Sequence, residues 1–387
     1  MDAGHERLIG IPAGNTVALV GDPGTGKTTF LLSFFCHGRI REYGPESDAG
    51  PPGARSIVLC STLPPGDRFN RLFLGSSASK LGGKNHKPLL RCFVSLESSY
   101  QRVRAHTHLL PVRNGTATED ADAFWFVDAT AFLSGRLEDY LRYLPAAPSE
   151  TPEWEQQESK DDTAGWRHYR LSLGGFGTED NPSFGLYWQG GEGKRPERIE
   201  SLSVDGGGGD HPFAGNHPTV LTLLTQTIQS PEQRIRLLKD LLAELFRRFP
   251  GHDCILAIDS LSALLSAPGQ DAAGQDDLPI RRLHMLNLVR WLEERGATTF
   301  MACEAVRPDD TLGGRPLFLG TQERYVASGV IQLNYHRYRS GDMIRYLRVL
   351  KMRGCGHDMR PYAYELGPEG ITWLELLFGE PMSGEGV

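Results

Sequence analysis

The sequence predicts a single α/β domain over residues 1–387: a mostly parallel central sheet flanked by helices, extended by antiparallel C-terminal strands and interrupted by two irregular insertions. Three observations support this fold class. A short apolar strand at 16–20 leads through a glycine-rich turn into an apolar helix at 28–37. Apolar strands and helices then alternate, as they do in sheets built from parallel β–α–β units. From residue 329 onward only short strands are expected, which indicates an antiparallel extension of the sheet.

The individual elements are predicted from the spacing of their apolar residues. The clearest helix is 232–249, where apolar residues recur every three or four positions: Ile235, Leu238, Leu241, Leu242, Leu245 and Phe246. Further helices are expected at 28–37, 99–110, 135–143 and 279–295. Strands are expected at 16–20, 56–60, 92–96, 124–128, 254–258, 298–302, 329–333, 343–351, 362–365 and 371–374.

The two insertions, residues 42–91 and 145–218, differ from the rest of the chain in composition. The first is rich in Gly, Pro and Ser, and its part from 68 to 91 holds six Lys or Arg and no acidic residue. The second is rich in glycine and holds 13 Asp or Glu against six Lys or Arg, a difference equal to the whole net charge of −7. Such sequence buries little apolar surface, so we expect partial disorder in the second insertion. Aromatic residues are expected to fix parts of it to the core: Trp154, Trp166, Tyr187 and Trp188.

Composition also predicts the compartment. No apolar run approaches the ~20 residues of a membrane-spanning helix, and the N-terminal sequence lacks the basic start and apolar core of a secretory signal. The cysteines show no CxxC spacing, which argues against a zinc site and against a disulfide framework. We therefore expect a cytoplasmic protein that contacts no membrane. Its cysteines are expected to be reduced and structural: Cys36, Cys60, Cys92, Cys254, Cys303 and Cys355.

The strongest functional pattern is a GxxxxGK[ST] motif that lies between a predicted strand and a predicted helix. Glycines let the backbone turn so that successive N–H groups face phosphate oxygens, and the helix N-terminus adds a favourable dipole. In such loops the lysine reaches the β- and γ-phosphates, and the hydroxyl that follows helps to ligate Mg²⁺. The predicted ATP site consists of the motif and the next residue: Gly21, Asp22, Pro23, Gly24, Thr25, Gly26, Lys27, Thr28 and Thr29.

A loop of this kind needs a further carboxylate that holds magnesium, usually at the end of an apolar strand. The segment 254–258 is such a strand, and Asp259 and Ser260 follow it directly. We expect Asp259 to ligate Mg²⁺, directly or through water, together with Thr28. Ser260 is expected to support this geometry.

ATP hydrolysis also requires a group that orients and deprotonates the attacking water. The strand end at 56–62 offers only hydroxyls, which are poor bases, whereas the one at 92–99 offers Glu97. The sequence FVSLESS around Glu97 resembles RecA-fold ATPases of the KaiC and RadA type, in which this strand ends in a glutamate before a helix. The resemblance implies a RecA-like fold and makes Glu97 the catalytic base. KaiC-type domains often carry two adjacent glutamates here, and the second position is Ser98.

The most specific resemblance lies near the C-terminus. Residues 349–358 read VLKMRGCGHD and match the KxRGxxH stretch of KaiC-like ATPases. In KaiC-like rings this stretch reaches across a subunit boundary to the ATP of the neighbouring subunit. The resemblance therefore implies that Lys351, Arg353 and His357 contact the γ-phosphate in trans, where cations stabilise the charge of the transferring phosphoryl group.

Two further segments resemble the same family. The strand ATTFMACE at 297–304 is similar to the family strand that ends in a sensing polar residue, which would be Glu304. The sequence before Gly329 is similar to a segment that usually carries an acid, replaced here by Ser328. The sequence holds one phosphate-loop motif, so we do not expect a tandem two-domain protein of this family.

Three functions remain open at this level. The first is an ATP-hydrolysing homo-oligomer, ring or filament, in which neighbours complete each active site. The second is a DNA recombination or repair ATPase. It needs a basic or aromatic loop; because 305–326 is neutral and 68–91 has few aromatic residues, DNA is not favoured. The third is a low-turnover nucleotide-dependent switch or scaffold, whose oppositely charged insertions bind a protein partner.

Overall fold

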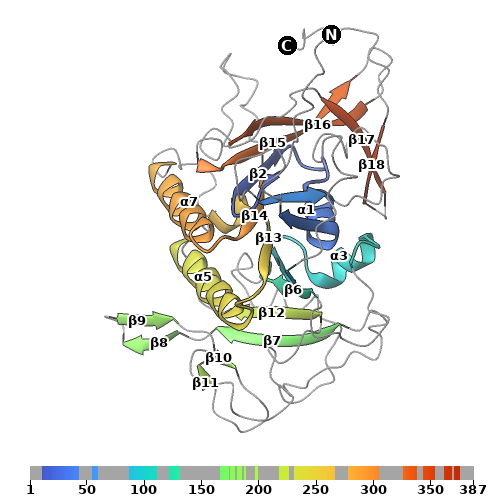
Figure 1. Ribbon diagram of the computed structural model, residues 1–387. Helices are drawn as coiled ribbons and strands as arrows, with labels where there is room; N and C mark the ends of the chain where they lie inside the picture. The colour runs from blue at the N-terminus through green and yellow to red at the C-terminus, as the bar shows by residue number, and fades with distance from the viewer. Residues whose placement is uncertain are drawn as a thin grey trace.

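An 11-stranded sheet forms the centre of the molecule (Figure 1). Its strand order is β18-β17-β16-β15-β2-β14-β13-β5-β6-β12-β7. The computed structural model describes residues 11–42, 55–59, 87–110, 122–130, 166–173, 175–178, 181–184, 187–188, 197–198, 218–225, 231–265, 278–304, 326–337, 343–353, 361–367 and 370–374.

The strands from β15 to β7 all run parallel to their neighbours, whereas β16, β17 and β18 extend the β15 edge by antiparallel pairing. The predicted fold class is therefore confirmed. The strands of this sheet are β2 (Thr16–Gly21), β5 (Leu89–Ser95), β6 (Ala123–Asp128), β7 (Arg167–Leu173), β12 (Thr219–Thr225), β13 (Asp253–Asp259), β14 (Thr298–Glu304), β15 (Gly329–Arg337), β16 (Met343–Met352), β17 (Tyr362–Gly367) and β18 (Gly370–Trp373).

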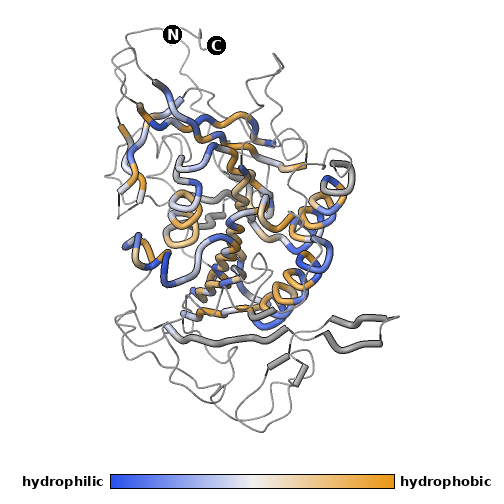
Figure 2. The backbone as a smooth tube through the Cα atoms, turned by 180° about the vertical axis from the view of Figure 1, so that it is seen from behind, coloured by the Kyte–Doolittle hydropathy of each residue, from blue (hydrophilic) through white to orange (hydrophobic). Residues whose placement is uncertain are grey.

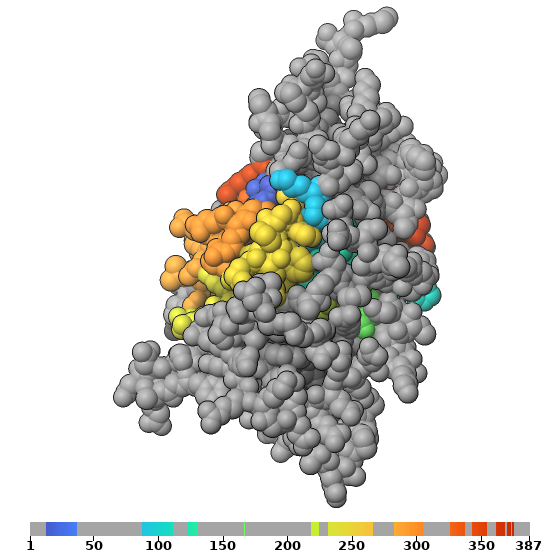
Figure 3. All heavy atoms as spheres, turned by 60° about the horizontal axis from the view of Figure 1, so that its bottom comes forward, coloured from blue at the N-terminus to red at the C-terminus, as the bar shows by residue number. Residues whose placement is uncertain are grey.

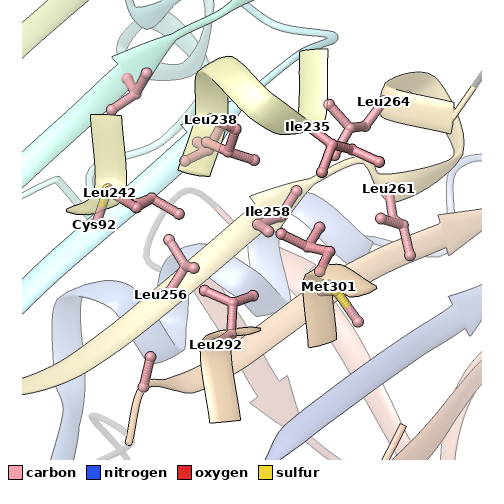
Figure 4. Close-up of a cluster of buried hydrophobic side chains, with 14 of the residues drawn as sticks. Cys92, Ile235, Leu238, Leu242, Leu256, Ile258, Leu261, Leu264, Leu292 and Met301 are labelled. Carbon is pink, nitrogen blue, oxygen red and sulfur yellow. The ribbon is translucent and has the colours of Figure 1, made fainter. Parts of the chain in front are cut away.

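Helices cover both faces of the sheet and divide the core into two clusters. On one face α1 (Lys27–His37) and α3 (Tyr100–His106) pack through aromatic residues, for example Phe34 stacked on Phe300 with ring centroids 3.9 Å apart. On the other face lie α5 (Pro231–Arg248), α6 (Leu261–Leu265) and α7 (Leu278–Glu293). Figure 4 shows this second cluster, where Leu238 and Leu242 of α5 meet Leu256 of β13.

The sequence pattern explains why the sheet lies between these layers. The central strands β2, β5 and β13 are buried on both faces, as parallel strands covered by helices are, and they are accordingly apolar along almost their whole length. The helices α5 and α7 carry an apolar stripe toward the sheet and polar residues outward, seen as mixed orange and blue in Figure 2. Figure 3 shows residues 231–265 and 282–304, drawn in yellow and orange, gathered on one face of the molecule.

Inside the two insertions the structure differs from the sequence prediction. The second one contributes β7, which joins the main sheet parallel to β12, and the short pairs β8 (Gly175–Thr178) with β9 (Asn181–Phe184) and β10 (Tyr187–Trp188) with β11 (Glu197–Arg198). As expected, Trp166 is buried and packs on Tyr100. These strands alternate too irregularly in hydropathy to be found by periodicity.

The first insertion also contains regular structure. The expected extra strand is β4 (Arg55–Leu59), which forms a separate sheet between β1 (Ile11–Pro12) and β3 (Gly38–Glu42). The last residue of the first insertion, Arg91, belongs to β5 and is fully buried. Its guanidinium lies 2.8 Å from the Asp122 carboxylate. Arg91 is therefore part of the core and not of a solvated basic loop.

Three smaller predictions can be compared with the described part of the chain. Within it, Cys36, Cys92, Cys254 and Cys303 are free thiols, whereas Cys60 and Cys355 lie outside it. The helix expected at 99–110 is shorter, ending at His106, and the one expected at 135–143 lies outside the described residues. None of the helices in the described ranges is long and apolar enough to cross a membrane.

Candidate functional site

The glycine-rich loop follows β2 and leads into α1 at the carboxyl ends of the parallel strands. Gly24 and Gly26 have positive φ angles of 78° and 89°, a conformation that residues with a Cβ rarely adopt. The loop closes on itself where the Thr25 hydroxyl donates to the Asp22 carbonyl at 2.8 Å. Helix α1 then begins with the Phe30 amide donating to the Gly26 carbonyl at 2.9 Å. The free N–H groups of this helix start are the kind that bind phosphate.

Lys27 lies in the loop that it is predicted to serve. Its ammonium donates to the carbonyl oxygens of Gly21 at 2.8 Å and Asp22 at 3.1 Å. These contacts hold the cation over the loop, so a triphosphate bound there would lie within reach of its charge. Thr29 follows on the first turn of α1, half-buried, and its carbonyl accepts from the Ser33 hydroxyl.

The two predicted metal ligands are in contact. The Thr28 hydroxyl donates to the Asp259 carboxylate at 2.7 Å, although the residues are 231 positions apart. Asp259 ends β13, which is separated from β2 only by β14, so parallel pairing brings both strand ends to the same edge. Burial, together with the nearby Glu97 and Glu304 carboxylates, raises the pKa of Asp259 to about 6, although the hydrogen bond from the Thr28 hydroxyl and the charge of Lys27 oppose the shift.

Glu97 lies beside this pair, in a turn directly after β5. Within the turn, the Ser95 hydroxyl donates to the Ser98 carbonyl at 2.6 Å. The Leu96 amide donates to the Asp259 carbonyl at 2.6 Å, which fixes the turn to the end of β13. The Ser260 hydroxyl donates to the Glu97 carboxylate, while the rest of Glu97 is exposed. The expected support from Ser260 is thus directed at Glu97.

Glu304 ends β14 and completes the row of carboxylates. It is exposed, and its backbone amide donates to the Ser262 hydroxyl at 2.9 Å. β14 pairs with β2 so that Glu304 lies level with Gly21, the first loop residue. The strand ends of β5, β13 and β14 therefore present Glu97, Asp259 and Glu304 next to the loop. This is the set that sequence reasoning named from strand ends.

One carboxylate of this edge was missed by sequence reasoning. Asp128 ends β6, is buried, and accepts from the Tyr100 amide at 3.1 Å and the Thr130 hydroxyl at 2.6 Å. Burial raises its pKa above the ordinary value, which the hydrogen bonds oppose. Because Tyr100 begins α3, Asp128 fixes the start of the helix that follows the Glu97 turn. Its place at the end of an apolar strand was the available signal.

The C-terminal cations Lys351 and Arg353 do not lie near the phosphate loop of their own chain. Lys351 pairs with Val330 and its ammonium donates to the Ala327 carbonyl at 2.7 Å. Arg353 is exposed, and its amide donates to the Ser328 carbonyl at 2.8 Å. Both are at the end of β15 that lies level with the start of β2, about 13 Å along the strand from the loop. His357 lies outside the described residues.

The C-terminal strands contact the loop through two further residues that no sequence motif marked. The Tyr364 hydroxyl donates to the Thr25 carbonyl at 2.6 Å, and Arg345 Nε lies 3.4 Å from the Gly24 carbonyl. The Arg345 guanidinium lies over the Tyr335 ring, 5.5 Å from its centroid. Arg345 is brought next to Tyr335 and Tyr364 by the antiparallel register of β15, β16 and β17. Such a register is not visible in the local sequence, so no motif identifies these residues.

The donor set suits a magnesium ion bound together with a nucleotide. The Thr28 hydroxyl and the Asp259 carboxylate are hard oxygen donors, which Mg²⁺ prefers. Among the described residues, no group of three or more His, Cys, Asp or Glu forms a metal cage. The Thr28–Asp259 pair therefore fits an ion that takes its other ligands from phosphate and water, as Mg²⁺ commonly does.

Comparisons with known proteins place part of the chain in the context of one ATPase family. Residues 217–377 match the model of the KaiC ATPase family, a range that includes Asp259, Lys351 and Arg353. A KaiC-like protein from the hyperthermophilic archaeon Pyrococcus horikoshii OT3 has a solved structure with 18% identity, coverage of 96% of this chain and 95% of that chain, and a TM-score of 0.40. No curated protein matches the chain. The family match confirms the KaiC-type resemblance over the C-terminal part and supports an ATP-binding module.

The first loop residue provides a test of how tightly the loop is held by β15. A Cβ on Gly21 would lie 2.5 Å from the Leu333 carbonyl oxygen and 2.8 Å from the Thr25 hydroxyl. Gly21→Ala should therefore lower the free energy of unfolding by about 3 kcal/mol, since backbone must shift to admit the methyl group. Gly251→Ala, where a Cβ meets nothing within 4 Å, should change it by less than about 0.5 kcal/mol. Urea unfolding measures both, and equal losses would contradict the close approach of β15.

Proposed function

We propose that this chain binds and hydrolyses ATP with Mg²⁺, as a head-to-tail homo-oligomer in which Lys351, Arg353 and His357 of one subunit complete the site of the next. The observation that carries the proposal is the meeting of the phosphate loop, Asp259 and Glu97 at one edge of the sheet. The match of residues 217–377 to the KaiC ATPase family supports the proposal as well. This support is independent of the phosphate loop and of Glu97, because both lie outside the matched range.

Nucleotide binding rests on the loop from Gly21 to Thr29. Its N–H groups and the start of α1 supply partial positive charge, and Lys27 supplies a full positive charge. Thr28 and Asp259 would hold Mg²⁺, which when bound neutralises charge on the β- and γ-phosphates. Asp259 is mostly buried and has two carboxylates nearby, so a cation at this position offsets charge that the fold leaves crowded.

Hydrolysis is assigned to Glu97. Its carboxylate is exposed on the side of the sheet edge that carries the loop, where water can reach it. One carboxylate oxygen accepts from Ser260, which limits the rotation of the side chain, and the other is left to orient and deprotonate water. Ser98, at the position of a second family glutamate, contributes only backbone groups to the turn hydrogen bonds. A single base is therefore proposed for this site.

The assembly in trans is supported by where the C-terminal cations lie. Lys351 and Arg353 are at the far end of the sheet from their own loop, so one subunit cannot bring both to its own γ-phosphate without breaking the β15–β16 pairing. A second subunit stacked head to tail can present them instead. A repeated heterologous contact of this kind closes into a ring or continues as a filament.

The other two functions receive less support from the described residues. The segments weighed for DNA binding, 305–326 and 68–91, lie almost wholly outside them. Of the basic segment, Arg91 is buried in a salt bridge and cannot contact a nucleic acid. A switch with little turnover would use the same loop and metal ligands, and the rate of phosphate release separates it from the proposed ATPase.

Replacing the proposed base should stop turnover and keep binding. Glu97→Gln keeps the side-chain size and the acceptor for Ser260 but removes the basic carboxylate, so steady-state phosphate release should fall about 100-fold or more. The dissociation constant for ATP should change by less than about threefold. The matched control is Glu294→Gln, at an exposed residue after α7, which should leave both quantities unchanged. Equal turnover of Glu97→Gln and wild type would remove Glu97 from the mechanism.

Mixing two inactive variants tests whether the sites are completed in trans. Arg353→Ala retains Glu97 but lacks the arginine that it would donate, and Glu97→Gln retains the arginine but lacks the base. Each alone should show greatly reduced phosphate release. An equimolar mixture should recover a substantial part of the wild-type rate, because a Glu97→Gln subunit can donate Arg353 to the intact base of its neighbour. No recovery, with both variants shown to co-assemble, would mean that Arg353 does not act across the boundary.

A further inference from the structure

Several carbonyl groups of the phosphate loop accept hydrogen bonds from other parts of the protein. Gly21 and Asp22 accept from Lys27, and Gly26 accepts from the α1 ladder. Two contacts come from the C-terminal strands: Arg345 with the Gly24 carbonyl, and Tyr364 with the Thr25 carbonyl. Residues more than 300 positions away thus take part in shaping the loop.

The Tyr364 contact is the stronger of the two. Its donor–acceptor distance is 2.6 Å, against 3.4 Å for Arg345, and the ring is only 1% exposed. Tyr364 pairs with Arg345 across β16 and β17, within the aromatic core that also contains α1. Burial raises the pKa of Tyr364, so the hydroxyl remains a donor throughout the neutral range.

The consequence for the loop follows from the geometry of one peptide unit. The peptide that joins Thr25 to Gly26 is planar and trans, so its carbonyl and its N–H point in opposite directions. Fixing the Thr25 carbonyl toward the core therefore turns the Gly26 N–H away from the core, toward the open side of the loop. Gly26 has a φ of 89°, and because glycine adopts positive and negative φ about equally readily, an external contact is needed to keep one orientation.

We propose that Tyr364 is a positioning residue of the phosphate loop, whose hydroxyl holds the Thr25–Gly26 peptide with its N–H facing the phosphates. This inference rests on the proposed nucleotide site and adds a residue to it. Tyr364 itself does not touch the nucleotide. It acts by orienting the Gly26 N–H before ATP binds, so that ordering of the loop does not reduce the free energy of binding.

Removing only the hydroxyl tests this role. Tyr364→Phe keeps the ring and its packing, so the variant should fold, at the modest cost of one hydrogen bond. The dissociation constant for ATP and the KM should both rise about three- to tenfold, with kcat within about twofold of wild type, since one net hydrogen bond corresponds to that range. Calorimetric titration and phosphate release measure these quantities.

The matched control is Tyr346→Phe, on β16. Tyr346 is half-buried and adjacent to Arg345, so it points to the opposite face of the sheet, away from the loop. This variant should bind ATP like wild type. An unchanged dissociation constant in Tyr364→Phe, or an equal rise in both variants, would overturn the proposal. If wild-type protein binds ATP in the same titration, that outcome removes only the role of Tyr364; if wild type binds none, the nucleotide site itself is wrong.

Discussion

The contact between the Thr28 hydroxyl and the Asp259 carboxylate, 2.7 Å long, joins the first turn of α1 to the end of β13 across the intervening strand β14. Around it the fold places a lysine, a loop of amide groups and two further carboxylates within one edge of the sheet. Asp259 is 2% exposed, and burying a carboxylate beside other acids is unfavourable unless a cation or several donors compensate. The fold therefore concentrates negative charge where a triphosphate-bound magnesium ion would neutralise it. This electrostatic balance favours the binding of Mg²⁺ at this edge of the sheet.

The C-terminal strands connect this edge to the surface where a neighbouring subunit is proposed to bind. At one end of β16, Arg345 lies against the loop of its own chain; six residues later, about 20 Å along the strand, Lys351 lies at the opposite end of the sheet. β16 pairs with β15 over residues 343–352 and with β17 over residues 345–347, and this pairing makes the strand a stiff element. In an assembly, β16 would have one end in each of two adjacent sites, and Tyr364 of the paired strand β17 would couple its position to the shape of the loop.

Local sequence patterns were sufficient for part of this description. The phosphate loop, Asp259, Glu97 and Glu304 all lie at the ends of apolar strands, and the parallel arrangement of those strands follows from their alternation with helices.

Contacts that depend on how distant strands pair could not be predicted in the same way. The approach of Tyr364 to Thr25 and the pairing of Ser260 with Glu97 join residues far apart in the chain, and no spacing rule encodes them. The strand β7 was missed because it lies in glycine-rich, acidic sequence, where tertiary pairing with β12 outweighs a weak local preference. Arg91 was taken for a surface cation because its partner Asp122, which directly precedes β6, is 31 positions away in the sequence.

The central claim is that main-chain amides and one ammonium group hold a triphosphate whose metal is held by Thr28 and Asp259. Calorimetric titration of ATP into wild-type protein and Lys27→Ala, each with Mg²⁺ and with the metal chelated, tests it most directly. We expect wild type to bind ATP, Mg²⁺ to strengthen that binding, and Lys27→Ala to lose at least about tenfold in affinity, as the removal of a charge-assisted contact implies. No binding by wild type, or equal affinity of Lys27→Ala, would contradict the account.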